Sequence, residues 1–114
     1  MSSVISKKNA THYSWGSNCD GWHLAKTPNL SVIQERVPQG SGEAKHYHSV
    51  AEQFFFILEG EAVMDFNEQT FTLTAGEGIH IAPGSPHMLC NMQEQDLVFL
   101  VVSTPPSHGD KVTV

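Results

Sequence analysis

Residues 46–60, HYHSVAEQFFFILEG, carry the pattern on which the interpretation of the whole chain depends. Side chains alternate between the two faces of a β-strand, so His46 and His48 present their imidazoles on the same face. The apolar and aromatic run at residues 53–58 is typical of a second strand, and Gly60 closes it with a turn signal. Since neutral imidazole is the commonest protein ligand for metals such as Zn, Ni or Fe, the stretch predicts a metal-binding β-structure.

A third histidine supports this metal site. His87 follows a strand-like run at residues 78–81 (GIHI) and a turn at residues 83–86 (PGSP). Its position just after a turn places it at the start of a further predicted strand. Two histidines on one strand and a third on another can converge on one ion if the strands lie close together in the fold.

The rest of the chain consists of short apolar runs separated by turn signals, which predicts an all-β fold. Residues 67–68 (Asn-Glu) mark the turn of a hairpin, and the tail that begins at Pro105-Pro106 is expected to lie extended over the surface. The remaining predicted strands are at residues 22–24, 30–37, 62–66, 70–73, 79–82, 87–91 and 96–103.

The composition excludes several classes of function. The 114 residues are expected to form one domain, residues 1–114, with a net charge of −6 and only six Lys and Arg residues. No basic cluster exists to neutralise phosphates, so a nucleic-acid binder is not expected. The chain shows neither a signal peptide nor an apolar run of membrane-spanning length. We therefore expect a cytoplasmic protein without membrane contact, in which Cys19 and Cys90 are free thiols.

Taken together, the motifs resemble those of the cupins, small β-barrels that hold a metal near one end. The first cupin motif is a Gly, five residues, H-x-H, three or four residues, a Glu, six residues and a Gly. The second is a Gly, five residues, P-x-G, two residues, a His, three residues and an Asn. The first motif matches residues 40–60 at Gly40, His46, His48 and Gly60. The second matches residues 76–91 at Gly76, Gly84, His87 and Asn91, with Ala82 in place of the first Pro. The resemblance implies a single cupin β-barrel, also called a double-stranded β-helix or jelly roll, of the small RmlC-like type.

The acidic ligand of the first motif is the informative departure from the cupin pattern. Counting six residues back from Gly60 reaches Gln53, whereas Glu52 fits only if a seventh residue is allowed. Alternation places Gln53 on the face of Phe55 and places Glu52 on the opposite face. We therefore expect one divalent transition metal, namely Zn, Ni, Fe or Mn, with Glu52 as the alternative to Gln53. The expected ligands are His46, His48, Gln53 and His87.

A glutamine ligand has chemical consequences. The neutral amide leaves the site with a charge near +2, so the metal is a stronger Lewis acid than it is beside a carboxylate. It also leaves no carboxylate ligand to act as a base, so the proton carrier must be Glu52, His80, Glu35 or water. The sequence does not decide among these, and it indicates no organic cofactor. Arg36 is a candidate clamp for a substrate carboxylate.

The cupins that bind metals include dioxygenases, isomerases, lyases and non-catalytic binding domains. The resemblance implies a metal-dependent enzyme, a dioxygenase or an isomerase, that acts on a small oxygen-bearing metabolite. The alternative is a non-catalytic domain that binds metal or a small molecule. The pectin-degradation cupins place Asp, Phe and Arg around a Pro-Pro, where this chain has Val101, Ser103 and Ser107. Their activity is therefore not inferred. We also expect a homodimer, because a small barrel has open sheet edges and an apolar outer face at Phe54 and Phe56.

Overall fold

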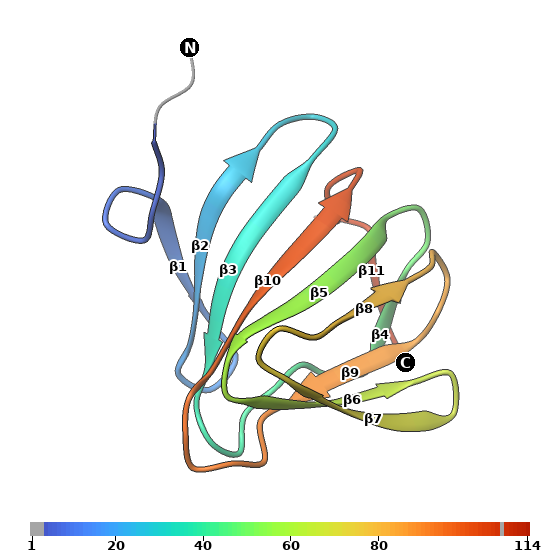
Figure 1. Cartoon of the computed structure of the whole chain (residues 1–114). Helices are drawn as coiled ribbons and strands as arrows, with labels where there is room; N and C mark the ends of the chain where they lie inside the picture. The colour runs from blue at the N-terminus through green and yellow to red at the C-terminus, as the bar shows by residue number, and fades with distance from the viewer. Residues whose placement is uncertain (1–3, 108) are drawn as a thin grey trace.

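Buried and partly exposed residues alternate along the main strands of the fold. In β3 (Ser31–Val37) and β10 (Leu97–Thr104) every second residue is buried, starting from Ser31 and from Leu97. This is the period-two pattern of strands with one face on a core and the other face outward. The computed structural model describes residues 4–107 and 109–114, and its elements are all β-strands (Figure 1). The predicted all-β fold is therefore confirmed.

The strands form two antiparallel sheets that face each other across the core (Figure 1). The six-stranded sheet has the order β1 (Thr11–Trp15), β2 (Cys19–Lys26), β3, β10, β5 (Glu52–Glu59) and β8 (Gly78–Ile81). The five-stranded sheet has the order β11 (Lys111–Thr113), β4 (His46–His48), β9 (His87–Cys90), β6 (Glu61–Phe66) and β7 (Gln69–Thr74).

Two turns account for how the chain passes between neighbouring strands. The hairpin between β6 and β7 turns at Asn67 and Glu68, both with positive φ (56° and 62°), as a two-residue hairpin turn requires. Gly60 links β5 of one sheet to β6 of the other with a φ of 82°. A side chain there would lie 2.6 Å from the carbonyl oxygen of Asp96. Only glycine combines that backbone conformation with that close approach.

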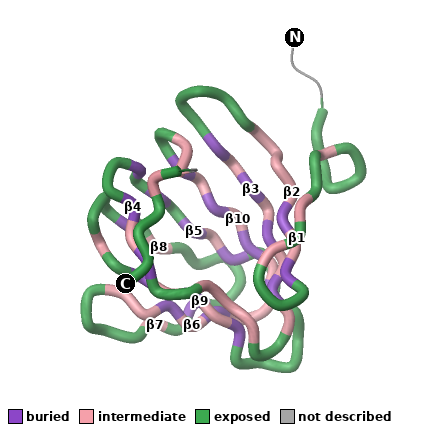
Figure 2. Tube along the Cα trace, turned by 180° about the vertical axis from the view of Figure 1, so that it is seen from behind, coloured by how far each residue is buried: buried purple, intermediate pink, exposed green. Residues whose placement is uncertain are grey.

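The core lies between the two sheets and draws on both. Phe55, Ile57 and Phe99 contribute from the six-stranded sheet, and Met64 and Leu89 contribute from the five-stranded sheet. All five are at most 1% exposed, and Figure 2 shows buried positions alternating with half-buried ones along β3 and β10. This core joins the two sheets. Polar residues gather instead beside β4 and β11.

Both ends of the chain differ from the sequence-based expectation. Residues 11–15 form β1, which the sequence pattern did not indicate, and pair with β2 at the edge of the six-stranded sheet. The tail is not simply extended, because β11 pairs with β4 from Lys111 opposite His48 to Thr113 opposite His46. Three-residue strands have too few residues to show alternation, so their pairing depends on the fold. The described part of the chain contains no helix long and apolar enough to cross a membrane.

Candidate metal centre

The five-stranded sheet brings the three histidines of the two motifs together. His46 and His48 are buried on the same face of β4, as the period of a strand requires. His46 pairs directly with His87 on the adjacent strand β9. One potential ligand nitrogen from each of the three imidazoles lies within 4.8 Å of the others. The fold therefore holds a buried three-histidine cluster that can bind a metal ion.

Backbone carbonyls orient two of the imidazoles. The Nδ1 atom of His46 lies 2.7 Å from the carbonyl oxygen of Ala44, and that of His87 lies 2.9 Å from the carbonyl of Ser85. A carbonyl only accepts hydrogen bonds, so Nδ1 is the donor in each case. The Nε2 atom of the neutral ring then keeps its lone pair for a metal. This carbonyl support is typical of histidines that ligate metals.

Gln53 approaches from the six-stranded sheet, where β5 carries it. Its Nε2 atom donates a hydrogen bond to Oγ of Ser103 at 3.0 Å. That bond directs the NH₂ group toward β10 and leaves the Oε1 atom buried without a hydrogen-bond partner among the described residues. An unpartnered buried acceptor is costly and calls for a ligand. Nδ1 of His48 and Nε2 of His87 are in the same condition.

Glu52 lies on the other side of the sheet. Its side chain is 51% exposed and accepts a hydrogen bond from Nε2 of His80 at 2.9 Å, and His80 is itself 56% exposed. Adjacent strand residues point to opposite faces, so the burial of Gln53 directs Glu52 outward. The structure thus places the alternative ligand Glu52 and the candidate base His80 away from the histidines. Whether Gln53 ligates the metal remains a prediction.

The donor set fits a divalent transition metal on physical grounds. Burial lowers the pKa of His46 to about 4, and it also lowers the pKa values of His48 and His87. The three rings are therefore neutral at neutral pH and present lone pairs rather than protons. Three imidazoles and one amide oxygen suit Zn, Ni, Fe or Mn, and a bound ion would give the buried Oε1 of Gln53 and Nε2 of His87 a partner.

A cavity of about 290 Å³ opens beside this cluster, between β1 and β3 on one side and β4 and β11 on the other. His46, His48 and Gln53 reach one part of its wall, and Ile33 and Val101 supply apolar surface. The other polar residues of the wall are Tyr13, Glu35, Glu43, Ser103, Ser107 and Lys111. The expected metal ligands and groups able to carry protons thus share one cavity of the size of a small metabolite.

Glu35 is the candidate base that the fold brings into this cavity. It is only 8% exposed and accepts a hydrogen bond from the phenol of Tyr13 at 2.8 Å. Burial raises its pKa to about 7, and burial together with the charge of Glu35 raises the pKa of Glu43 to about 8. Carboxyl groups that titrate near neutral pH can both give and take protons there.

Arg36 lies outside the cavity. Its guanidinium donates to Asp20 at 2.7 Å, to Asp96 at 3.2 Å and to the carbonyl of Asn18 at 2.7 Å. It is therefore a surface ion-pair residue and does not clamp a ligand beside the histidines. Three wall residues, Tyr13, Glu43 and Lys111, were not inferred from the sequence. Tyr13 and Lys111 belong to the two strands that pattern analysis did not find, and Glu43 precedes β4 in an irregular segment.

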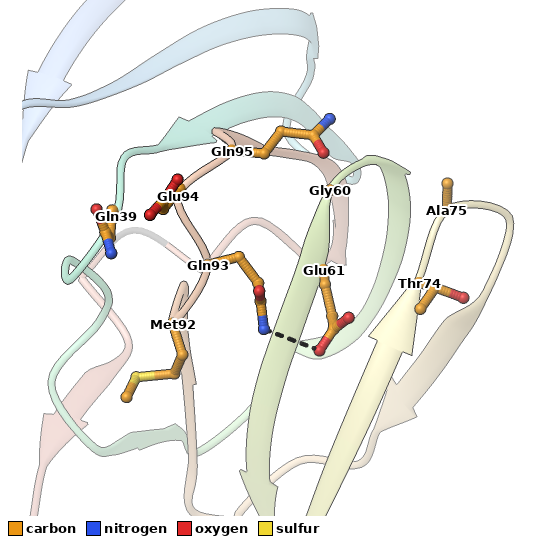
Figure 3. Close-up of a pocket in the computed structure, with 9 residues that line it drawn as sticks. All are labelled: Gln39, Gly60, Glu61, Thr74, Ala75, Met92, Gln93, Glu94 and Gln95. Atoms are coloured by element: carbon orange, nitrogen blue, oxygen red, sulfur yellow. Dashed lines mark hydrogen bonds between the residues drawn. The ribbon is translucent and has the colours of Figure 1, made fainter.

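A second hollow, of about 700 Å³, lies at the other end of β5, beside Gly60 (Figure 3). Gln93 donates a hydrogen bond to Glu61 across it at 3.3 Å. Its wall is mostly polar, with glutamines and glutamates beside Gly60, Thr74, Ala75 and Met92, and none of the described histidines lines it. It is larger than the cavity beside the histidines but holds no group positioned for chemistry, so the smaller cavity is the candidate site.

Comparisons with known proteins agree with this geometry. The family model described as "Cupin domain" matches residues 33–103, which include all three histidines and Gln53. The uncharacterized protein MJ1618 of Methanocaldococcus jannaschii is 36% identical over 89 residues, which cover 77% of this chain and 71% of that protein.

Two further relatives carry functional names. The polyketide synthase CurC of Streptomyces cyaneus is 30% identical over 57 residues, which cover 50% of this chain and 37% of that protein. The structure of the polyketide cyclase RemF from Streptomyces resistomycificus superposes with a TM-score of 0.84 at 18% identity, covering 100% of this chain and 86% of that one. At 18% identity, the similarity to RemF shows a shared fold only.

Proposed function

The chain belongs to the cupin domain family, and we propose that it is a metal-dependent enzyme that moves protons on a small oxygen-bearing anion, as in an isomerisation or a cyclisation. The cupin fold serves many activities, so the reaction has to be argued from the site itself. The metal is one divalent transition ion on the three buried histidines and Gln53.

The observation that carries this proposal is the position of Glu35. Its carboxyl group lines the same cavity as His46 and His48, with a pKa of about 7. A group whose pKa is close to the working pH is the most effective general acid or base. Dioxygen chemistry at a metal does not require such a carboxyl group, so its presence favours proton transfer over the dioxygenase alternative.

The residues divide the work between two sides of the cavity. The metal, when bound, supplies Lewis acidity that polarises a substrate carbonyl or hydroxyl group. Gln53 contributes an oxygen without a negative charge, which keeps that acidity high. Glu35 takes a proton from the substrate and returns it at another position, and Tyr13 stabilises the carboxylate form by donating to it. The apolar residues Ile33 and Val101 limit the access of water.

Charge and size indicate the substrate class. Lys111 lines the cavity, and within the described residues no carboxylate lies within ion-pair distance of its ammonium group. A cation at the mouth and a neutral ligand set around a divalent ion favour an anionic ligand. The volume of about 290 Å³ limits it to a small molecule. The name of the relative CurC supports a compound with neighbouring carbonyl groups, which chelate metals well.

The first experiment measures metal content. The purified chain is expected to hold about one divalent metal ion, a prediction made from the ligand count. His48→Ala and His87→Ala should each lose it while the exposed variant His12→Ala keeps it. Undiminished metal in both variants of the histidine cluster would remove the basis of the proposal.

The second experiment measures proton transfer. Small β-dicarbonyl anions such as acetoacetate are incubated with zinc-loaded protein in D₂O, and exchange of their acidic C–H groups is followed by NMR. Exchange above the rate of free zinc is expected. It should fall at least about tenfold in Glu35→Gln, which loses a general base, and persist in the outward-facing variant Glu52→Gln. Oxygen consumption by iron-loaded protein, without exchange by the zinc-loaded protein, would favour the dioxygenase, because zinc itself is redox-inactive. Binding without either activity would favour a non-catalytic domain.

A further inference from the structure

One row of residues crosses three strands beside the metal cavity. Tyr13 on β1 pairs with Gly21 on β2, and Gly21 pairs with Glu35 on β3. Residues in such a row point to the same face of the sheet, here the face of the cavity. Tyr13 and Glu35 are therefore next-nearest neighbours separated by the glycine. Their side chains nevertheless meet, with the phenol 2.8 Å from the Glu35 carboxylate.

Tyr13 can reach Glu35 only because Gly21, which lies between them, has no side chain. A Cβ atom at Gly21 would lie 2.5 Å from the phenol oxygen of Tyr13 and would overlap its ring carbons. The φ of Gly21 is not in the left-handed region, so the backbone alone does not call for glycine there. The space above Gly21 is filled by the ring of Tyr13 as it reaches across β2.

We propose that Tyr13 is a positioning residue that holds the Glu35 carboxyl group in the cavity, and that Gly21 keeps open the space through which it does so. The inference rests on the proposed function, in which Glu35 carries the proton. It assigns a role to the N-terminal strand β1, which lies outside the matched family region.

The surroundings of Glu35 explain why one donor has a large influence. Among the described residues, Tyr13 is the one whose side chain donates a hydrogen bond to this carboxylate. The titratable groups that interact with its charge are Glu43 from the segment before β4, Lys111 from β11 and Cys19 from β2. The charge of Lys111 favours the carboxylate form, but Lys111 lies in the exposed wall of the cavity. The charge of Glu35 in turn raises the pKa values of Glu43 and Cys19. Tyr13 thus supplies the direct contact that favours the carboxylate form and fixes its direction.

The test is a double-mutant cycle of Tyr13→Phe and Gly21→Ala in the full chain loaded with zinc, a diamagnetic ion. The Glu35 carboxyl carbon is titrated by NMR, and Ser14→Ala, an exposed neighbour on β1, is the control. Tyr13→Phe should raise the Glu35 pKa by about one pH unit, because the carboxylate loses its donor. Gly21→Ala should raise the Glu35 pKa by a similar amount, because the added methyl group pushes the Tyr13 phenol away from the carboxylate although the phenol is retained. The double variant should shift no further than a single one, and Ser14→Ala should not shift it.

Three results would overturn the inference: an unchanged Glu35 titration in Tyr13→Phe, an unchanged titration in Gly21→Ala, or additive shifts in the double variant. An amide spectrum of each variant shows whether it is folded, and Tyr13→Phe keeps the ring so that packing is preserved. If the chain takes up none of Zn, Ni, Fe and Mn, the proposed function is wrong, and the same titration on the metal-free chain still decides whether Tyr13 and Gly21 act on Glu35.

Discussion

At the scale of single residues, Gln53 as the proposed neutral oxygen ligand would set the charge of the metal centre. Gln53 stands where the cupin motif has a glutamate, and its Oε1 atom is buried without a partner among the described residues. With three neutral histidines around it, a divalent ion would keep its full charge. Such a centre attracts anions more strongly than one with a carboxylate ligand.

Gln53→Glu tests this charge argument. The variant should retain the metal, since a carboxylate is also a good ligand, but it should bind oxalate at least about tenfold more weakly because the net charge of the centre falls by one. Calorimetry of oxalate binding, with metal content measured on the same samples, gives the answer. Equal oxalate affinity in the parent and the variant would show that residue 53 does not influence the metal.

Glu35 makes folding stability depend on pH. Its pKa is about 7 in the folded chain, compared with an ordinary value of 4.5. The neutral form is therefore favoured by folding. Its contribution to stability is complete below pH 4.5 and is lost as the pH rises through 7. At 1.36 kcal/mol per pH unit, the loss amounts to about 3 kcal/mol.

Glu35→Gln, which cannot ionise, should therefore gain stability relative to the parent as the pH rises from 5 to 8. Urea unfolding of the metal-free chains across this pH range measures the difference in unfolding free energy between the parent and the variant. The histidines contribute with the opposite pH dependence, but equally in both chains, so their contribution cancels in the difference. Glu52→Gln on the outer face is the control. A constant difference between parent and Glu35→Gln would mean that Glu35 is not held in its neutral form.

At the scale of elements, the C-terminal segment closes the wall beside the metal site. Asp110 precedes β11 and accepts backbone hydrogen bonds from Ser49, Val50 and Ala51 at 3.1, 2.9 and 2.9 Å. Those three residues connect β4, which ends at His48, to β5, which carries Gln53 one residue after its start. The carboxylate thus fixes the loop that sets the two expected ligand strands relative to each other.

Asp110→Ala should weaken metal binding by about tenfold or more, as is typical when support around metal ligands is removed. The metal dissociation constant is measured by competition with a chelator. Asp96→Ala, which removes a carboxylate from the exposed ion pair with Arg36, should leave it unchanged. If Asp110→Ala lowers thermal stability but leaves metal affinity intact, the loop does not set the ligand geometry.

At the scale of the whole molecule, the outer face of the six-stranded sheet carries an apolar patch. Val32, Val102 and Phe54 form one row across β3, β10 and β5, and Leu100 pairs with Phe56 in the next. Phe54 is 41% exposed and stacks on Phe56 with ring centroids 6.3 Å apart. The N-terminal strand β1 lies at the opposite edge of the sheet from β8 and does not cover this face (Figure 1).

We expect a second copy of the chain to cover this face, because contiguous apolar surfaces of this kind mark association sites and two-fold pairing is the commonest solution. Sedimentation should give twice the chain mass of 12.5 kDa. Val102→Glu should give the monomer mass while metal content is retained. Met92→Glu, a change at an exposed loop residue outside this face, should remain dimeric. A parent that sediments as a monomer at micromolar concentration contradicts the prediction.

The local sequence pattern was enough to predict the features that depend only on residues close together in the chain. Period-two alternation correctly placed His46 and His48 together and put Gln53 inward and Glu52 outward, and the turn signal at Asn67 and Glu68 correctly located the hairpin. Strand geometry alone dictates these relations, because side-chain direction follows from position parity. The motif glycines and His87 then identified the family and the jelly-roll fold, both of which are confirmed.

The choice among candidate proton carriers depended on contacts between segments that are distant in sequence. Glu35 and His80 look alike as isolated strand residues, yet one lies in the cavity and the other outside, because strand pairing and the closure of the two sheets decide which face encloses a space. Tyr13 reaches Glu35 only because β2 places Gly21 between them, and Asp110 reaches residues 49–51 only because β11 pairs with β4. Such pairings are set by the total burial and hydrogen bonding of the folded chain, and no local pattern encodes them.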